Sequence, residues 1–151
     1  MSIKRNASAV WQGNLKDGAG NLSTDSGILS ETPYSFSTRF ENKSGTNPEE
    51  LIAAAHAGCF SMAFSAELLK AGFPPDSIHT QATVTLEKVP SDFTITEVHL
   101  AVDAQVPKIT DSEFMKIAEA AKLGCPVSKL LKAKITLDAK LMSEEKARVA
   151  S

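Results

Sequence analysis

The first forty residues show the alternation of side chains that is typical of β-strands. Every second residue of 7–11 is alanine or tryptophan, and a segment rich in Gly, Asn and Asp follows at 13–21. We expect a half-buried strand and then a turn there. The clearest alternation is at 34–40, where aromatic side chains recur in one phase. This pattern predicts a strand with an aromatic inner face, and it places Arg39 on the opposite face.

One long apolar segment, residues 51–69, is typical of a buried helix. Asn47 suits the N-cap of this helix, Pro48 suits its first position, and Glu50 completes a capping box. The segment is apolar on nearly all sides and long enough to cross a membrane. Alanine dominates it, however, and polar residues interrupt it: His56, Ser61, Ser65 and Glu67. We therefore expect the centre of a fold or of a dimer, and no membrane span.

The second half of the chain predicts a strand pair followed by two helices. Alternation at 82–87 and 93–106 indicates two strands, and a change of phase near Glu97 indicates a β-bulge. A capping box at Thr110 opens one helix, and a proline that follows a cysteine opens a short helix over 125–133. Two further helices and a bulged strand pair are therefore expected.

A last strand is expected at 135–141, before a charged tail at 143–151 that we expect to fray. The order of elements is a β-meander, a long helix, a hairpin, two helices and a strand, which is α+β rather than a regular βαβ repeat. The 151 residues suit a single domain over 1–151.

Composition and charge exclude several classes of function. The formal net charge is −2 and no five like charges occur in a row, so neither nucleic acid nor an anionic membrane is an expected partner. Aromatic residues make up 6% of the chain, too few for base-stacking platforms. The first residues are polar and lack the apolar core of a signal peptide. The expected compartment is therefore the cytoplasm.

Two cysteines, Cys59 and Cys125, lie far apart in the sequence. They are too few for a disulfide framework or a Cys-rich zinc site. Cys59 lies in the middle of the long helix, where a buried and inert thiol is common. Cys125 lies at a helix start, where free N–H groups and the helix dipole favour a thiolate. The residues alone leave both an inert pair and a redox pair open.

Three other residues are candidates for chemistry. Glu49 has no local role beyond the helix dipole, and Arg39 is either a solvated residue or a cation that stabilises a thiolate. His56 lies one helical turn from Cys59, and together with Cys125 these residues could supply three zinc ligands. No fourth ligand and no Cys-x-x-Cys pair accompany them. We therefore expect neither a metal nor a cofactor.

Two segments of the chain together resemble those of one family. Residues 46–62, TNPEELIAAAHAGCFSM, and residues 124–129, GCPVSK, resemble the OsmC/Ohr family. Residues 38–41, TRFE, and 134–137, KITL, resemble the OsmC branch more than the Ohr branch. The similarity extends over nearly the whole chain, from residue 9 to residue 141.

The resemblance implies a cytoplasmic, thiol-dependent peroxidase that reduces organic hydroperoxides better than hydrogen peroxide. It implies an OsmC-like α+β fold, in which antiparallel sheets wrap around long central helices of an intertwined homodimer without metal or prosthetic group. By matching motif positions, Cys59 is the peroxidatic thiol and Cys125 the resolving thiol. Arg39 and Glu49 match the polar pair beside the reactive sulfur. The implied reductant is a dithiol of the lipoyl kind.

Geometry adds an expectation about the polar pair. A buried thiol resists ionisation, so a reactive Cys59 needs a nearby cation. Glu49 precedes Cys59 by ten residues on the same helix, so the two are about 15 Å apart along its axis. We therefore predict that Arg39 and Glu49 act on Cys59 of the partner subunit.

The apolar residues around Cys59 have two interpretations. Phe60, Met62 and Phe64 either line a pocket for the alkyl part of a hydroperoxide or pack in the core. Two functions compete with the peroxidase: a stress protein that binds hydrophobic small molecules and has non-catalytic cysteines, and a general disulfide oxidoreductase. The lack of a Cys-x-x-Cys motif argues against the oxidoreductase.

Overall fold

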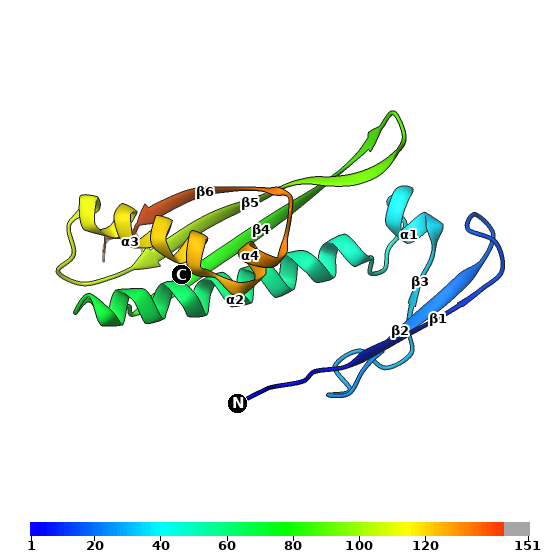
Figure 1. Ribbon diagram of the computed structural model, residues 1–151, viewed down its shortest axis with the longest axis horizontal. Helices are drawn as coiled ribbons and strands as arrows, with labels where there is room; N and C mark the ends of the chain where they lie inside the picture. Colours follow the sequence, from blue (N-terminus) through cyan, green and yellow to red (C-terminus); the bar gives the residue numbers. More distant parts are fainter. Residues whose placement is uncertain (144–151) are drawn as a thin grey trace. The chain divides into compact units, whose positions relative to one another are not determined.

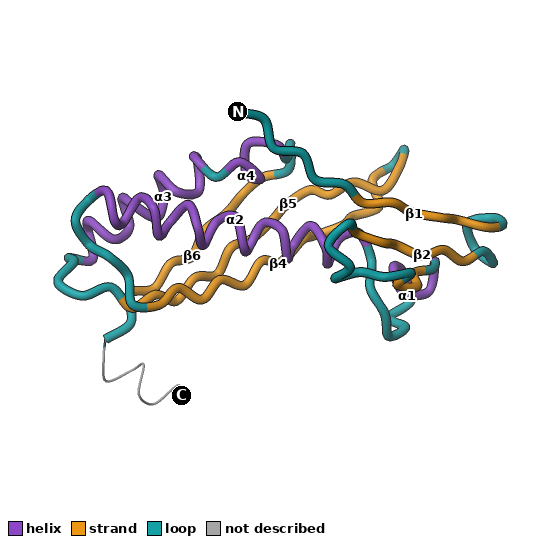
Figure 2. Tube along the Cα trace, turned by 90° about the horizontal axis from the view of Figure 1, so that it is seen from below, coloured by secondary structure: helices purple, strands orange, loops and turns teal. Residues whose placement is uncertain are grey.

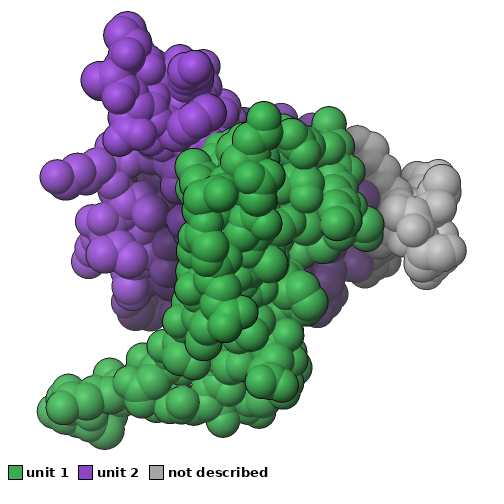
Figure 3. Space-filling view, turned by 90° about the vertical axis from the view of Figure 1, so that its right-hand side faces the viewer, with its two compact units in different colours: residues 1–51 green, residues 52–151 purple. Residues whose placement is uncertain are grey.

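The computed structural model describes residues 1–143, so most of the predicted tail lies outside the described residues. The chain forms two compact units, residues 1–51 and 52–151, which Figure 3 shows in different colours. The boundary falls within the first turn of the long helix α2 (Pro48–Lys70). Each unit is described by itself.

The first unit contains a three-stranded antiparallel sheet in the order β1-β2-β3. Its strands are β1 (Ala7–Gln12), β2 (Ala19–Thr24) and β3 (Thr32–Tyr34). Gly20 on β2 lies opposite Trp11 and Tyr34, whose rings are 5.4 Å apart between centroids. A Cβ atom on Gly20 would collide with the carbonyl oxygen of Val10 and with both rings. Glycine at this position therefore lets the two rings meet across β2.

The strand predicted at 34–40 is wrong, because the chain leaves β3 at Tyr34 and forms the short helix α1 (Phe36–Phe40). Ser35 is the N-cap, and it shares a reciprocal capping box with Thr38. The rings of Phe36 and Phe40 lie 4.8 Å apart on one side of α1. Their four-residue spacing fits a helical turn as well as two strand repeats, and the local cap selects the helix.

The long helix α2 begins and ends as the sequence predicts. The side chain of Asn47 accepts a hydrogen bond of 2.8 Å from the backbone N–H of Glu50. At the other end, Gly72 adopts a φ of 89°, and its N–H donates to the carbonyl oxygen of Leu69. The N–H of Phe73 donates to the carbonyl oxygen of Leu68 in the same way. This pair of bonds is a Schellman motif, which favours glycine at its left-handed position.

The second unit is built on a three-stranded sheet in the order β4-β5-β6. Its strands are β4 (Ser77–Val89), β5 (Asp92–Gln105) and β6 (Lys134–Leu141). β4 and β5 are antiparallel, and their register shifts where Thr85 faces Glu97 but Leu86 faces Ile95. The predicted bulge near Glu97 is therefore confirmed.

The strand β6 departs from the expected antiparallel arrangement, because it runs parallel to β5. The connection between them contains α3 (Asp111–Gly124) and α4 (Pro126–Leu130). A connection of this length can return the chain to the same end of the sheet, as a parallel pair requires. Thr110 caps α3 through the predicted box with Glu113, whereas α4 ends earlier than the predicted residue 133.

Helices α2 and α3 lie along one face of the β4-β5-β6 sheet (Figures 1 and 2). Alternate residues of β5 point from the sheet toward these helices, as the alternation of apolar and polar residues in its sequence predicts. Most of the buried core comes from three elements, and Val106 and Cys125 complete it. The side chains from these elements are Phe60, Phe64 and Leu68 of α2; Val98, Leu100, Val102 and Ala104 of β5; and Phe114, Ala118 and Ala121 of α3.

Aromatic rings pack between α2 and α3. The centroids of Phe60 and Phe64 are 5.6 Å apart, and those of Phe64 and Phe114 are 5.4 Å apart in an edge-on arrangement. Truncation of a buried phenylalanine to alanine costs about 3–5 kcal/mol. These rings therefore fix how α2 lies against the rest of its unit.

By length and composition alone, α2 could also cross a membrane, and it is the one such helix among the described residues. Its buried residues recur every four positions, at His56, Phe60, Phe64 and Leu68. This stripe packs against a sheet, which is the arrangement of a core helix. The interpretation of α2 as a core helix agrees with that packing.

His56 is the one polar side chain that is fully buried among the described residues. Its Nε2 atom lies 2.8 Å from the hydroxyl oxygen of Ser128 on α4, whereas no described residue bonds its Nδ1 atom. Burial lowers the pKa of His56 below its ordinary value of 6.5. His56 is therefore a neutral imidazole in the folded protein at neutral pH.

A buried neutral histidine makes stability depend on pH in a predictable direction. Below about pH 6.5 the unfolded chain gains a proton at His56 that the folded chain does not accept, so stability falls as the pH falls. We expect the difference in urea midpoint between wild type and His56→Gln to shrink from pH 7.5 to pH 5.5. A difference that stays constant over this interval would show that His56 titrates normally in the folded state.

Candidate active site

The two cysteines meet between α2 and α4. Cys59 is half-buried in the middle of α2, and Cys125 is fully buried at the N-cap of α4. Their Sγ atoms are 3.1 Å apart, and both are free thiols. A disulfide has an S–S length of about 2.05 Å. An approach of about 1 Å would therefore join them, so this pair can cycle between two thiols and one disulfide.

The two thiols differ in their ease of ionisation. Burial raises the pKa of Cys59, the hydrogen bond with Cys125 raises it further, and the N–H of Val127 opposes these effects only in part. Burial also disfavours the Cys125 thiolate, but the N–H of Ser128, the Cys59 thiol and the Ser128 hydroxyl together lower the pKa of Cys125. Of the two thiols, Cys125 is therefore the one that ionises more readily.

Within a single chain, the surroundings of Cys59 thus disfavour its thiolate. The groups that act on Cys59 are its buried surroundings, Cys125 and Val127, and none of these described groups is a cation. Cys125, by contrast, is the N-cap residue of α4. The backbone N–H groups of Val127 and Ser128 lower its pKa, although its side chain makes no capping hydrogen bond. Reactivity at Cys59 thus requires a positive charge from outside its own surroundings.

Arg39 and Glu49 form a tight ion pair in the first unit. The Nη2 atom of Arg39 is 2.7 Å from Oε1 of Glu49, and its Nε atom is 3.1 Å and 3.2 Å from the two carboxylate oxygens. The guanidinium also lies 5.1 Å from the ring centre of Phe40. Glu49 is 12% exposed and Arg39 is 35% exposed. The carboxylate therefore fixes a guanidinium whose outer part is open to a ligand.

An aromatic pocket of about 260 Å³ lies beside this guanidinium within the first unit. Its lining combines strands β1 and β3 with helix α1: Trp11, Leu15, Tyr34, Ser35, Phe36, Arg39 and Phe40. Sequence reasoning missed this pocket. The signal was the run of aromatic residues around Arg39, which was interpreted as the inner face of a strand.

The three apolar residues near Cys59 do not form the pocket that was one of their two predicted interpretations. Phe60 and Phe64 are fully buried core residues, which supports the core-packing alternative for both. Met62 is 76% exposed on the opposite side of α2. None of the three lines a pocket described above, so the aromatic pocket around Arg39 is the stronger candidate for an alkyl group.

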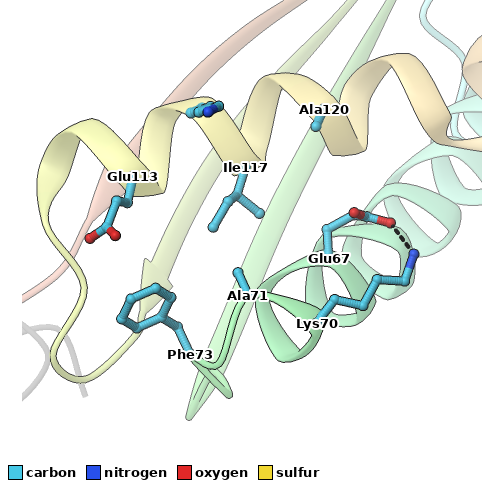
Figure 4. A pocket seen from close by; sticks show the side chains of 8 residues that line it. Glu67, Lys70, Ala71, Phe73, Glu113, Ile117 and Ala120 are labelled. Carbon is cyan, nitrogen blue, oxygen red and sulfur yellow. Dashed lines mark hydrogen bonds and ion pairs between the residues drawn. The ribbon is translucent and has the colours of Figure 1, made fainter.

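A second pocket, of about 440 Å³, lies between the end of α2 and α3 (Figure 4). Phe73 and Ile117 give it an apolar wall, and Glu67 forms a 2.7 Å ion pair with Lys70 at its edge. The lining contains neither cysteine nor the Arg39–Glu49 pair. This pocket is therefore separate from the thiol chemistry.

His56 is not arranged as a metal ligand. Its Nε2 atom faces the Ser128 hydroxyl. Within residues 1–143, no three His, Cys, Asp or Glu side chains gather in a way that could hold a metal ion. The chemistry that the described residues offer is therefore that of two thiols.

Comparison with known proteins gives a consistent result. A model of the family described as OsmC-like protein matches residues 41–140. The protein Peroxiredoxin OsmC of Escherichia coli strain K12 is 54% identical over 143 residues, which are 95% of this chain and 100% of that protein.

Solved structures share the fold. An OsmC-like protein of unknown function from Vibrio cholerae matches with a TM-score of 0.73 and 17% identity, over 92% of this chain and all of that one. The organic hydroperoxide resistance protein OhrB of Bacillus subtilis matches with a TM-score of 0.66 and 22% identity, over 89% and 98% of the two chains. The thiol pair, the fold and the sequence match agree, and the chain belongs to the OsmC-like protein family.

Proposed function

We propose that this protein is a thiol-dependent peroxidase that reduces organic hydroperoxides to alcohols. The observation that carries the proposal is the 3.1 Å approach of Cys59 and Cys125 between α2 and α4. The names of two relatives support it, since one is called a peroxiredoxin and another an organic hydroperoxide resistance protein. Free thiols suit a reducing compartment such as the cytoplasm.

The reaction begins at Cys59, the more accessible of the two thiols. Its thiolate attacks the distal oxygen of the hydroperoxide, an S–O bond forms, the O–O bond breaks, and the alkoxide leaves and takes a proton as alcohol. Cys59 is oxidised to a sulfenic acid, and the peroxide is reduced. The buried thiolate of Cys125 then attacks this sulfur. An S–S bond forms, the S–O bond breaks, and hydroxide leaves as water after protonation.

An external dithiol of the lipoyl kind completes the cycle. One of its thiolates attacks the disulfide and forms a mixed disulfide, and the second closes a cyclic disulfide and releases the protein thiol. The two electrons that reduced the hydroperoxide are thus returned. A dithiol is favoured because its second thiol is held beside the mixed disulfide, which makes release intramolecular.

A homodimer supplies the missing cation in this proposal. The side of α2 opposite its buried stripe carries exposed small or apolar residues every four positions: Ala54, Gly58, Met62 and Ala66. Nothing lies within 4 Å of the position of a Cβ atom on Gly58, so a second helix could approach closely there. Two such chains form the functional dimer, in which Arg39 and Glu49 act on Cys59 of the partner subunit.

The aromatic pocket explains a preference for organic substrates. Its rings offer an apolar surface to an alkyl or aryl group, and Arg39 at its edge offers hydrogen bonds to the peroxide oxygens. Hydrogen peroxide has no group to fill such a pocket. The preference therefore arises from burial of the organic part.

The same pocket favours a second candidate function, that of a stress protein that binds hydrophobic small molecules. In that case the cysteines take no part in function. The two candidates differ in one observable: a mild organic hydroperoxide removes both free thiols of a peroxidase, and it leaves both thiols of a binding protein.

Cysteine variants test the catalytic cycle. With cumene hydroperoxide and dihydrolipoamide, Cys59→Ser is expected to abolish peroxide consumption, because no nucleophile remains at the open position. Cys125→Ser is expected to consume one equivalent and then stop as a sulfenic acid, which dimedone traps. Parallel assays with hydrogen peroxide and with a monothiol should both be slower in wild type. Sustained turnover by Cys59→Ser would contradict the proposal.

Mixing two inactive variants tests the origin of the cation. If Arg39 acts across the dimer, a mixed dimer of Arg39→Gln and Cys59→Ser contains one complete site. Random exchange of subunits should then restore about a quarter of the wild-type activity. The matched control mixes Cys59→Ser with Cys59→Ala, which cannot complement. Activity no greater than that of the separate variants would show that Arg39 acts within its own chain or not at all.

A further inference from the structure

His56 and Ser128 connect the two segments that carry the cysteines, and the proposed cycle does not yet use them. His56 precedes Cys59 by three residues on α2, and Ser128 follows Cys125 by three residues in α4. The 2.8 Å contact between His56 Nε2 and Ser128 Oγ joins residues 72 positions apart in the sequence. His56 is fully buried, so this contact is shielded from water.

Ser128 acts on Cys125 through two groups. Cys125 is the N-cap residue of α4, and the third residue of a helix is one that an N-cap side chain faces. The backbone N–H and the hydroxyl of Ser128 both stabilise the charged form of the Cys125 thiol. Ser128 therefore contacts His56 at 2.8 Å and lies at the third position of the helix that Cys125 caps.

The direction of these hydrogen bonds follows from the unpaired nitrogen of His56. If Nδ1 carried the proton of the neutral ring, a buried N–H would lack a partner, and the Ser128 hydroxyl would donate to Nε2. If Nε2 carries the proton, it donates to Ser128 Oγ, and the hydroxyl proton is free to donate to Cys125. The second tautomer leaves Nδ1 as an unpaired acceptor instead of an unpaired donor and frees the hydroxyl proton to point toward Cys125, so we take it as the more stable one.

We propose that His56 and Ser128 are positioning residues that hold the Ser128 hydroxyl toward Cys125 Sγ and so keep Cys125 ready to attack the oxidised Cys59. The inference rests on the proposed function for its catalytic meaning. In the step concerned, the Cys125 thiolate forms the S–S bond and is oxidised, the Cys59 sulfenic sulfur is reduced, and hydroxide leaves. His56 and Ser128 retain their protons throughout, because their role is to stabilise the thiolate before it attacks.

Few other titratable groups compete for this role. Cys59 faces Cys125 from α2, and His56 acts through Ser128. On α3, Lys122 forms an ion pair with Glu119, and on α4 Lys129 is exposed. On the strands, His99 of β5 bonds Thr136 of β6, and it lies in the opposite phase from the buried Val98 and Leu100. Besides the Cys59 thiol, the Ser128 hydroxyl is thus the donor among the described residues that a variant can remove without a change of charge.

The titration of Cys125 tests the inference without any need for activity. In the full-length Cys59→Ser chain, thiolate absorbance near 240 nm reports Cys125 alone. Ser128→Ala is expected to lower the thiolate fraction at neutral pH about tenfold, as loss of one hydrogen bond to a charged group implies. His56→Leu should act in the same direction. His56→Gln keeps an N–H near the position of Nε2 and should restore the parent titration.

Ser61→Ala is the matched control, because it removes another half-buried hydroxyl from α2, one that bonds Ala57 and Thr80 instead of a cysteine. It should leave the titration unchanged. Circular dichroism verifies the fold of each variant. If His56→Leu fails to fold, the titration of Ser128→Ala alone tests the inference, because this residue is only half-buried. A Ser128→Ala titration that coincides with the parent, or a His56→Gln variant as impaired as His56→Leu, overturns the inference.

Rapid-quench experiments in the chain that retains both cysteines separate this inference from the proposed function. After Cys59 is oxidised by cumene hydroperoxide, disulfide closure should be about tenfold slower in Ser128→Ala than in Ser61→Ala. If the hydroperoxide oxidises no thiol in either chain, the proposed function fails, and the titration still decides the role of Ser128.

Discussion

The contact between two sulfur atoms at 3.1 Å is the interaction on which the proposed function of this protein depends. Neither sulfur lies in a flexible loop. Cys59 is held in the middle of a 23-residue helix, and Cys125 is held between two helices at a fully buried position. The aromatic contacts of Phe64 with Phe60 and Phe114 fix these elements against one sheet. The core of the unit thus sets the distance between the thiols.

The two thiols also differ in pKa, and this difference suits two different roles in the proposed cycle. Helix N–H groups and the Ser128 hydroxyl favour the anion at Cys125, whereas burial and the neighbouring thiol disfavour it at Cys59. The lowered pKa of Cys125 suits the second step of the proposed cycle. The first step of that cycle needs a cation, and a carboxylate already fixes one at Arg39. A guanidinium that reaches Cys59 only in an assembled dimer would couple reactivity to assembly.

Much of the fold could be predicted from local patterns, because alternation, caps and turn residues are local. The limits of α2 and α3, the bulge near Glu97 and the final strand follow from such signals. The helix at Phe36–Phe40 was missed because aromatic residues four apart fit both periods, and the Ser35 cap decides between them. The parallel direction of β6 depends on a long crossover, which no local pattern encodes. The pairing of Cys59 with Cys125 was predicted from the family resemblance, because the number of residues between two cysteines does not tell how far apart they lie in space.

The central claim is tested most directly by peptide mapping under non-reducing conditions, after one equivalent of cumene hydroperoxide per chain. The account predicts loss of both thiols, release of one equivalent of cumyl alcohol, and a single disulfide between Cys59 and Cys125 of the same chain. Persistence of both free thiols, or bridges only between chains, would contradict it.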